Sequence, residues 1–248
     1  MLGSSRARHG RRQLSGVREI DSALREGSEI RLLLVRRNVE DPGILALVGR
    51  AENLGLNVRQ VSANDLRRMS VVQPAGDLLA LLGPDPGADP GTVLSAGGAV
   101  WLLSGSAYPG NVGFAVRTAE VSGADGIFVD TDLVGRSRHR AMRASMHAGR
   151  FFPVHWLETA KVVEMAREAG KRIIAVEDTG TKAPWETDLA GSILLILGGE
   201  GAGIPPEILE GCTEVMRIPM AGFIPSYNLH AAMAAIAVER LRQTGMGQ

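Results

Sequence analysis

The chain has 248 residues, of which 45% are hydrophobic, 22% charged and only 4% aromatic. This length allows a substantial core in one large domain or two modest ones, and the composition excludes a disordered or collagen-like chain. The 27 basic and 27 acidic side chains cancel, which argues against coating of nucleic acid by bulk charge but allows a local basic surface. The few aromatic residues argue against a broad base-stacking platform.

The cysteine content and the amino-terminal segment indicate which kinds of protein this chain is not. Cys212 is the only cysteine, which excludes an internal disulfide framework and a cysteine-rich metal site, so we expect no metal and a reducing, cytoplasmic environment. Residues 1–12 are polar and contain four arginines, so they predict a flexible basic arm rather than a secretory signal. No apolar run reaches the length of a membrane helix.

The first part of the chain predicts a small α/β domain over residues 13–82. Apolar periodicity and turn residues predict helices at 16–26, 41–54 and 64–69, and strands at 30–35 and 57–61. A stretch dense in glycine and proline, GPDPGADPGTVLSAGG, follows at 83–98, and it predicts a linker.

Strands and helices alternate again in residues 99–248. We expect strands at 99–103, 127–130, 172–176, 193–197 and 215–218, and helices at 111–122, 138–147, 157–169 and 226–243. Short apolar runs separated by helices are typical of a parallel sheet covered on both faces. The predicted fold class is therefore α/β.

The first segment whose residues could take part in binding or catalysis is 108–130. Asn111 is predicted to cap the helix that follows, and Gly113 and Arg117 are four residues apart on one helix face. This places an amide and a guanidinium beyond the carboxyl end of a strand, which is the usual ligand side of an open α/β sheet. The alternative is an ordinary cap and a solvated arginine.

The second segment is ILLILGGEGAGIPPEIL, residues 193–209. A buried strand enters a turn with glycines at 198, 199, 201 and 203 and Glu200 among them, and glycines allow backbone amides to approach a ligand closely. The spacing does not fit the dinucleotide fingerprint G-x-G-x-x-G, and prolines interrupt the expected helix start. An ordinary strand-to-helix turn is the alternative.

The third segment, residues 216–243, joins a strand to a long helix through an irregular loop. Ser226 is predicted to cap the helix, and Leu229 and Met233 belong to its apolar face. Ser226 and Asn228 place polar groups at the mouth of the loop, where the commoner role of such residues is to satisfy free backbone groups.

The order and spacing of the three segments resemble the SpoU (TrmH-type) family of RNA 2′-O-ribose methyltransferases, in the SPOUT superfamily. Asn111-x-Gly113-x-x-x-Arg117 resembles the first motif, 197–204 the second, and 218–222 with 226–229 the third. Arg143-Ala-Ser145 matches a further family pattern. The resemblance is close over 99–243, and the preceding residues resemble the family's small substrate-binding domain.

The resemblance implies a deep trefoil knot in the carboxyl-terminal domain, a homodimer, and S-adenosylmethionine as cofactor. The knot would be one of the rare exceptions to unknotted chain connections. Loops of the second and third motifs would hold the cofactor. The residues implied in cofactor binding are Leu197, Gly198, Gly199, Gly201, Ile218, Met220, Asn228 and Leu229.

The implied reaction methylates a ribose hydroxyl, which is a poor nucleophile at neutral pH and needs orientation and proton removal. The resemblance assigns Arg117 to this step, in some descriptions as a base. A guanidinium hardly ever loses its proton in a protein, so we expect Arg117 to act as a bidentate clamp on a phosphate or ribose oxygen. Asn111, Glu200, Ser226 and Asn228 would fix the substrate and loops.

Several residues depart from the family pattern. They are Tyr108 in place of an acid, Phe114 in place of alanine, Phe223 and Pro225 in the third loop, and His147 and His230 in place of small residues. The pKa of a histidine lies close to neutrality, so His230 could serve as a base. Packing of His230 on its helix is the simpler interpretation.

The expected RNA-binding surface is basic and local. Arg136, Arg138 and Arg143 lie with two further arginines in one segment that lacks acidic residues, and Arg11 and Arg12 belong to the arm. We expect RNA as the partner, ribosomal RNA ahead of transfer RNA. The alternatives are a catalytically silent RNA-binding SPOUT module and a nucleotide-dependent oxidoreductase, which would need the missing fingerprint.

Overall fold

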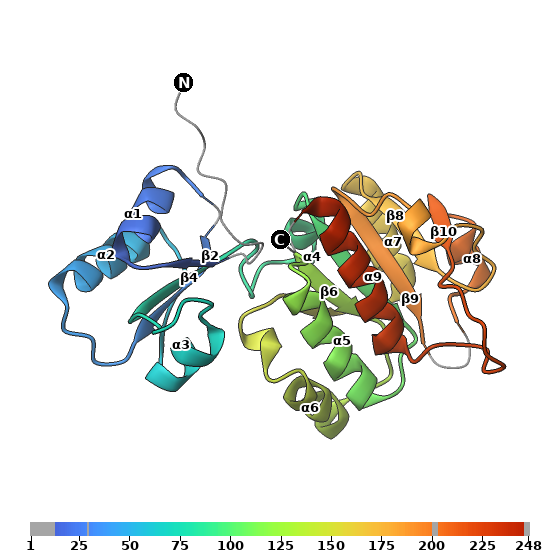
Figure 1. Ribbon diagram of the computed structural model, residues 1–248, viewed down its shortest axis with the longest axis horizontal. Helices are drawn as coiled ribbons and strands as arrows, with labels where there is room; N and C mark the ends of the chain where they lie inside the picture. Colours follow the sequence, from blue (N-terminus) through green and yellow to red (C-terminus); the bar gives the residue numbers. More distant parts are fainter. Residues whose placement is uncertain (1–12, 29, 200–202, 246–248) are drawn as a thin grey trace. The chain divides into compact units, whose positions relative to one another are not determined.

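The computed structural model describes residues 13–28, 30–199 and 203–245 (Figure 1). The predicted arm, with Arg11 and Arg12, lies outside these residues, as do Glu200 and Gly201 of the glycine-rich turn. The described chain divides between Gly87 and Ala88 into two compact units.

The smaller unit, up to Gly87, has a four-stranded sheet in the order β1-β4-β2-β3. β2 pairs with β3 in parallel and with β4 antiparallel, and β4 also pairs antiparallel with β1. Its elements are β1 (Gln13–Ser15), α1 (Val17–Arg25), β2 (Ile30–Arg36), α2 (Pro42–Asn53), β3 (Val58–Val61), α3 (Ala63–Met69) and β4 (Leu78–Leu82). The five predicted elements of this region are confirmed within one or two residues, whereas β1 and β4 were not predicted.

Helix starts in this unit follow from local chemistry. Asp41 accepts a hydrogen bond from the backbone N–H of Ile44 at 2.9 Å, and Pro42 at the first helical position has its φ already set for a helix. Ser62 and Asp65 form a reciprocal capping box at the start of α3. These side chains explain why the predicted boundaries hold.

The predicted linker at 83–98 is partly wrong, because residues 90–95 form α4 (Pro90–Ser95). Asp89 caps this helix by accepting from the backbone N–H of Thr92 at 3.1 Å. Val93 and Leu94 are fully buried in the core of the larger unit. The glycines and prolines that suggested a linker are in part helix-start signals.

The larger unit contains a six-stranded sheet in the order β10-β8-β9-β5-β6-β7, in which every pair is parallel. Its strands are β5 (Ala99–Ser104), β6 (Gly126–Val129), β7 (Val154–Trp156), β8 (Arg172–Val176), β9 (Ile193–Gly198) and β10 (Glu214–Met216). Its further helices are α5 (Pro109–Val121), α6 (Gly135–Ala144), α7 (Thr159–Glu168), α8 (Pro206–Leu209) and α9 (Leu229–Thr244), with 3-10 turns η1 (Ala148–Arg150) and η2 (Pro184–Glu186). The predicted parallel α/β sheet is confirmed.

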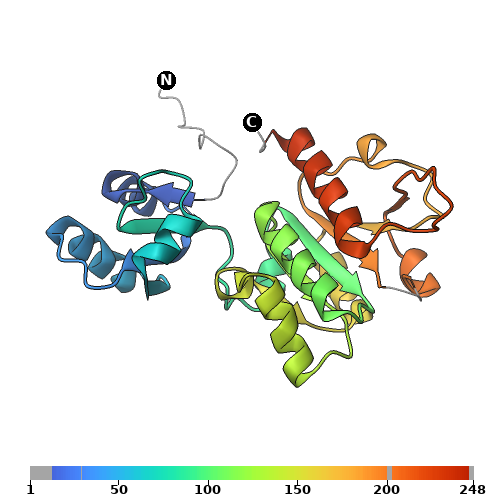
Figure 2. The same ribbon diagram turned by 60° about the horizontal axis from the view of Figure 1, so that its bottom comes forward.

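Alternation along the strands divides the core between the two faces of this sheet. Trp101 of β5 packs in the cluster formed with α5 and α9, whereas its neighbour Leu102 packs in the cluster formed with α4 and α7. α5 and α9 lie side by side in both views (Figures 1 and 2). Because both faces are covered, the central strands β5 and β9 each contain five consecutive apolar residues.

Two predicted helix caps are wrong. Pro109 starts α5, so Asn111 lies inside its first turn and Tyr108 occupies the cap position without a side-chain hydrogen bond. α9 starts at Leu229, and its cap is Asn228 rather than Ser226, since the Asn228 Oδ1 accepts from the backbone N–H of His230 at 3.1 Å. The Asn111 side chain instead accepts a hydrogen bond from Asn228.

Among the described residues, no helix combines the length and apolar character needed to cross a membrane.

Candidate active site

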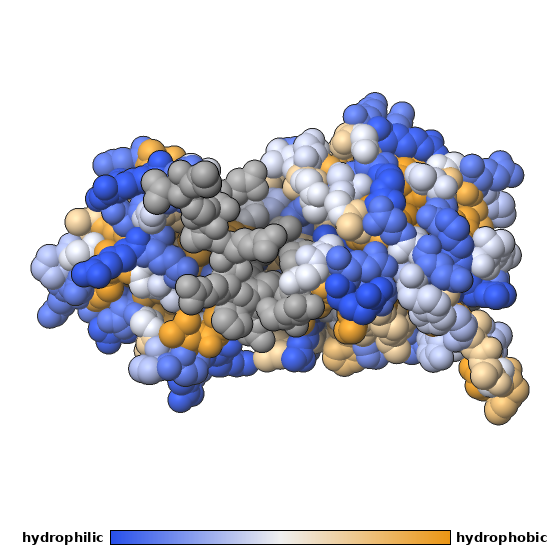
Figure 3. Space-filling view, turned by 45° about the horizontal axis from the view of Figure 1, so that its top comes forward, coloured by the Kyte–Doolittle hydropathy of each residue, from blue (hydrophilic) through white to orange (hydrophobic). Residues whose placement is uncertain are grey.

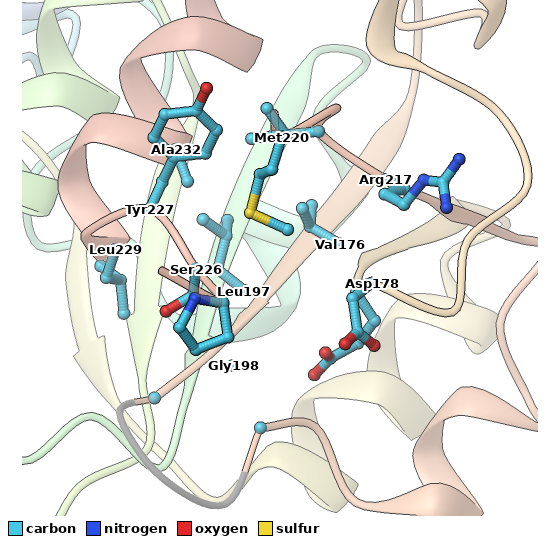
Figure 4. Close-up of a pocket in the computed structure, with 15 residues that line it drawn as sticks. Val176, Asp178, Leu197, Gly198, Arg217, Met220, Ser226, Tyr227, Leu229 and Ala232 are labelled. Atoms are coloured by element: carbon cyan, nitrogen blue, oxygen red, sulfur yellow. The ribbon is translucent and has the colours of Figure 1, made fainter. Parts of the chain in front are cut away.

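A pocket of about 360 Å³ lies in the larger unit, at the carboxyl ends of β8 and β9 (Figure 4). Three segments form it: the end of β8, the glycine-rich turn after β9, and the loop from β10 into α9. Its apolar lining residues are Val176, Leu197, Ile218, Met220, Pro225, Tyr227, Leu229 and Ala232. Its polar and glycine lining residues are Glu177, Asp178, Gly198, Gly199, Gly203, Arg217 and Ser226.

The structure brings most of the predicted cofactor residues together at this pocket. Those that line it are Leu197, Gly198, Gly199, Ile218, Met220 and Leu229, together with the predicted catalytic Ser226. Asn228 is not among the lining residues, although its neighbours Tyr227 and Leu229 are. Its side chain is instead directed to α5, as described below.

The pocket has one apolar side and one acidic edge. In Figure 4 the Met220 side chain extends into the pocket between Tyr227 and Val176, and the carboxylate of Asp178 lies at the opposite edge from Leu229. The loop that carries Met220 is exposed and apolar, with Phe223 95% and Ile224 59% exposed, and it projects from the surface in Figure 3. Such a lining suits a flat apolar group carrying a few polar substituents.

Glu177 and Asp178 were missed by the sequence analysis. Glu177 Oε1 accepts a hydrogen bond from the backbone N–H of Ile204 at 2.7 Å, so it ties the far side of the glycine-rich turn to the end of β8. Their position directly after the predicted strand at 172–176 could have identified them. Ligands of open α/β sheets bind at the carboxyl ends of strands.

The glycines of the turn are required by backbone packing. A Cβ at Gly199 would meet the backbone of Gly105, and one at Gly198 would meet the backbone of Gly203. Gly199 and Gly203 also form an isolated antiparallel bridge. The predicted close approach of backbone is therefore present, but at these two positions the approaching group is the chain itself.

A hydrogen-bonded relay joins the first and third motifs. Asn228 Nδ2 donates to Asn111 Oδ1 at 3.3 Å, and His230 Nδ1 lies 2.6 Å from Asn228 Oδ1. The His230 ring also contacts Phe114, with ring centroids 5.1 Å apart. The ring therefore packs against α5 rather than on its own helix as predicted, and it makes a polar contact as well.

Arg117 and Gly113 have different surroundings, although both belong to α5. Gly113 is buried where α6 crosses, and a Cβ there would meet the Ala141 carbonyl oxygen and the Ala144 side chain. Arg117 is exposed and makes no hydrogen bond or ion pair with the described residues. Its guanidinium is therefore available to a bound molecule.

The arginines of α6 divide into two groups. Arg136, Arg140 and Arg143 are exposed, as expected of residues that contact RNA. Arg138 is half-buried: its Nε donates to the Leu133 carbonyl at 2.6 Å, and its guanidinium lies 4.6 Å from the centroid of the Trp156 ring. These intramolecular contacts would therefore have to be given up, at least in part, for Arg138 to bind RNA as predicted.

Within the described ranges no cluster of three or more histidine, cysteine or acidic side chains could hold a metal ion. The side chains that line the pocket offer carboxylates, a guanidinium, hydroxyls and apolar groups.

A wholly parallel sheet with a glycine-rich turn and an apolar pocket at its carboxyl edge defines an α/β domain that binds a small organic ligand. Residues 99–238 match the model of the SpoU rRNA Methylase family, and this is more than half of the chain. The chain therefore belongs to that family, as the resemblance of its motifs predicted.

Individual relatives agree with this assignment. Over 136 residues the chain is 30% identical to an uncharacterised tRNA/rRNA methyltransferase of Synechocystis, a match that spans 54% of this chain and 50% of the relative. It is 25% identical over 241 residues to the 23S rRNA (guanosine-2′-O-)-methyltransferase RlmB of Bordetella pertussis, which covers 93% of this chain and 96% of the relative.

Solved structures share the fold. The SpoU methyltransferase AviRb from Streptomyces viridochromogenes, in complex with AdoMet, superposes with a TM-score of 0.57 at 24% identity. The superposition covers 100% of this chain and 96% of AviRb. At this level of identity the likeness establishes the architecture.

Proposed function

We propose that the protein transfers a methyl group from S-adenosylmethionine to a ribose 2′-oxygen of RNA. The observation that carries the proposal is the convergence of the three family motifs: the second and third form one pocket, and the first is hydrogen-bonded to the third through Asn111 and Asn228. The names of the Bordetella relative and of the AdoMet-bound neighbour support the reaction and the cofactor.

The side chains that line the pocket fit this cofactor. Leu197, Ile218 and Leu229 offer an apolar surface to an adenine ring, and carboxylates at the opposite edge can accept hydrogen bonds from ribose hydroxyls. Glu177 and Asp178 also provide negative charge that favours a cationic ligand. When bound, the cofactor supplies a methyl group already activated by its positively charged sulfur.

The chain's own residues then have two tasks. Arg117 binds a phosphate or ribose oxygen of the substrate through two parallel N–H donors and stabilises negative charge as the hydroxyl loses its proton. Asn111 and Asn228, fixed to each other across α5 and α9, hold the loop of the third motif in place. Glu200 and Ser226 complete the proposed catalytic set.

We further propose a homodimer. Large apolar side chains on the neighbouring helices α5 and α9 are exposed, with Phe114 at 43%, Val121 at 70% and Val238 at 66%. Contiguous exposed apolar surface is typical of an interface. Val238→Glu should shift the protein to a monomer in light-scattering chromatography, and an unchanged mass would place any interface elsewhere.

The deep knot implied by the family is also a proposal. After β8 the chain passes the end of β10. There Lys182 forms an isolated parallel β-bridge with Met216, and the backbone N–H of Arg217 donates to the Lys182 carbonyl at 2.8 Å. The same connection contacts α9, since Gln243 Nε2 donates to the Thr187 carbonyl at 3.0 Å. The chain leaving β10 would have to pass inside this connection to reach α9. In force spectroscopy, a knotted chain stretched from both ends stays shorter than its full contour of about 3.6 Å per residue.

The deciding experiment is methyl transfer from labelled cofactor to bulk RNA, followed by mapping of 2′-O-methylation in cells with and without the gene. Label in ribosomal RNA, lost with the gene, is the expected result, and label in transfer RNA would change the substrate. Binding of RNA and cofactor without transfer would favour the silent module instead.

A further inference from the structure

We propose that His230 is a positioning residue, whose ring nitrogen Nδ1 holds the Asn228 amide in the one orientation that joins α9 to α5. The consequence for catalysis rests on the proposed methyltransferase function, whereas the contact itself does not. Position 230 is one of the places where this sequence departs from the small residue that the family resemblance implies.

The hydrogen bonds around Asn228 fix the orientation of its amide. Oδ1 accepts from the backbone N–H of His230 at 3.1 Å and faces Nδ1 of the same residue at 2.6 Å. Nδ2 donates to Asn111 Oδ1 at 3.3 Å. A carbonyl oxygen has two lone pairs, and both are used here. A flipped amide would place an N–H group against the backbone N–H of His230 and lose the bond to Asn111.

The geometry also fixes where the His230 ring carries its proton. Asn228 Oδ1 can only accept, so Nδ1 must be protonated. Free imidazole side chains favour the other tautomer, with the proton on Nε2. Either the neutral Nδ1–H form or the imidazolium can make this bond, so the contact does not require a particular charge on His230.

Packing holds the ring in reach of the amide. His230 is half-buried, and its ring lies against Phe114 with an interplanar angle of 49°. Phe114 and Asn111 are three residues apart on α5 and therefore share a face of that helix. The two ends of the relay thus rest on the same helix, and a small residue at 230 would leave the amide held only by the helix cap and the bond to Asn111.

This arrangement matters because Asn228 lies between two residues that line the pocket, Tyr227 and Leu229. At metal sites, loss of an outer partner that orients a ligating side chain costs about tenfold or more, and we expect a similar effect here. We expect His230→Ala to lower the single-turnover rate by about tenfold. His230→Asn, which places an amide nitrogen near the position of Nδ1, should recover most of the loss.

The pH–rate profile separates positioning from base catalysis. If His230 positions Asn228, the alanine variant is slower by the same factor at every pH, because Nδ1 donates in both charge states. If His230 were the base, its removal would erase the acidic limb of the profile. Loss of that limb, or a wild-type rate in His230→Ala, would overturn the positioning role.

A tautomer measurement tests the contact without any activity. In the full chain with ¹⁵N-labelled histidine, spectra at alkaline pH should show the neutral His230 ring protonated on Nδ1. His139, exposed on α6, serves as the reference and should favour Nε2. Asn228→Ala should return His230 to the Nε2 form, whereas Asn228→Asp, which keeps the acceptor, should retain Nδ1–H.

An Nε2-protonated His230 in the wild type would overturn the proposal, even if the enzyme were active. Conversely, an Nδ1–H ring in a protein without methyl transfer would confirm the contact while the proposed function failed. The two failures are therefore distinguishable.

Discussion

Among single residues, Arg117 has the most direct test, because its guanidinium is exposed and has no partner among the described residues. Arg117→Ala should lower turnover by at least about a hundredfold and leave cofactor affinity within a few-fold. Arg117→Lys should be almost as damaging, because an ammonium cannot make two parallel hydrogen bonds. Single-turnover rates and calorimetric titration with the cofactor provide the readouts, and substantial activity in the lysine variant would contradict the bidentate role.

Glu177 offers a second test at this scale. Glu177→Ala removes the acceptor of the Ile204 N–H and should weaken cofactor binding roughly tenfold to a hundredfold, since a hydrogen bond to a charged group contributes about 1.5–3 kcal/mol. Glu177→Gln keeps an acceptor oxygen and should lose less. Titration calorimetry measures both, with Asp178→Asn as the control that changes charge at the same edge. Equal affinities for the alanine variant and the wild type would remove Glu177 from the site.

Single residues also show which parts of the site could be predicted from the sequence. Leu197, Gly198, Gly199 and Leu229 line the pocket, and the motif spacing had assigned them to strand and helix ends. The caps were misassigned, since Pro109 already starts α5 and Asn228 is two residues closer to the helix than Ser226. The contacts Glu177–Ile204 and Asn111–Asn228 join positions 27 and 117 residues apart, and no local pattern encodes such distances.

Among the elements, the crossing of α5 and α6 depends on the absence of a side chain at Gly113. Gly113→Ala would push a methyl group into the backbone of α6 and should lower the free energy of unfolding by about 1–3 kcal/mol. Gly110→Ala is the matched control in the same helix, because its Cβ would meet nothing within 4 Å. It should be neutral or stabilising by about 0.5–1 kcal/mol. Urea denaturation compares the two, and equal losses would show that the helix crossing is not the cause.

Lys171 ties the amino-terminal ends of β5 and β9 to α4. Its Nζ donates to the carbonyls of Ala96 and Gly98 at 2.7 and 3.0 Å, and burial lowers the pKa of this ammonium. A lowered folded-state pKa means that the unfolded chain binds more protons between the folded pKa and the ordinary value of 10.5, so stability rises with pH in that window.

The test of Lys171 is a comparison with Lys171→Met. Because the variant leaves the two partly buried carbonyls of Ala96 and Gly98 without this donor, it should be less stable at neutral pH by about 1–3 kcal/mol. The gap should widen as the pH rises toward 10.5, because only the wild type has the titrating group. Denaturation at a series of alkaline pH values measures it, and a gap that narrows would show that the pKa is not lowered.

Among the elements, sequence patterns predicted most of the strands but missed β1, β4 and β7. β5, β8 and β9 were predicted within one residue because four or five apolar residues run together. β1 and β7 have three residues each, too few for a pattern to show. β4 is an apolar run that was overlooked, and α4 was hidden by prolines that commonly signal a turn.

At the scale of the whole molecule, the two units imply a division of labour. A fragment of residues 88–248 keeps α4 and every residue that lines the pocket, so it should bind S-adenosylmethionine with an affinity close to that of the full chain while RNA methylation falls. A fragment starting at 99 loses Val93 and Leu94 from the core and should be less stable. If the longer fragment folds yet calorimetry shows no binding, the cofactor site needs the amino-terminal unit.

The exposed arginines of α6 should control RNA affinity and its salt dependence. Each arginine that contacts a phosphate of single-stranded RNA contributes a slope of about 0.7 in log K against log salt. Arg136→Ala and Arg140→Ala should therefore weaken RNA binding and flatten the slope, while the single-turnover rate at saturating RNA stays near that of wild type. Binding across a salt series decides, and an unchanged slope would exclude these side chains from phosphate contact.

The pairing of β5 with β9 has a consequence for handling the protein. Ala99 lies opposite Ile193 in the sheet, so residues more than ninety positions apart must meet before either strand is covered. Until then, uncharged segments such as ILLIL and AVWLL can pair with the same segments of other chains and aggregate. Recovery after denaturation should therefore fall steeply as protein concentration rises, and rapid dilution should outperform slow dialysis.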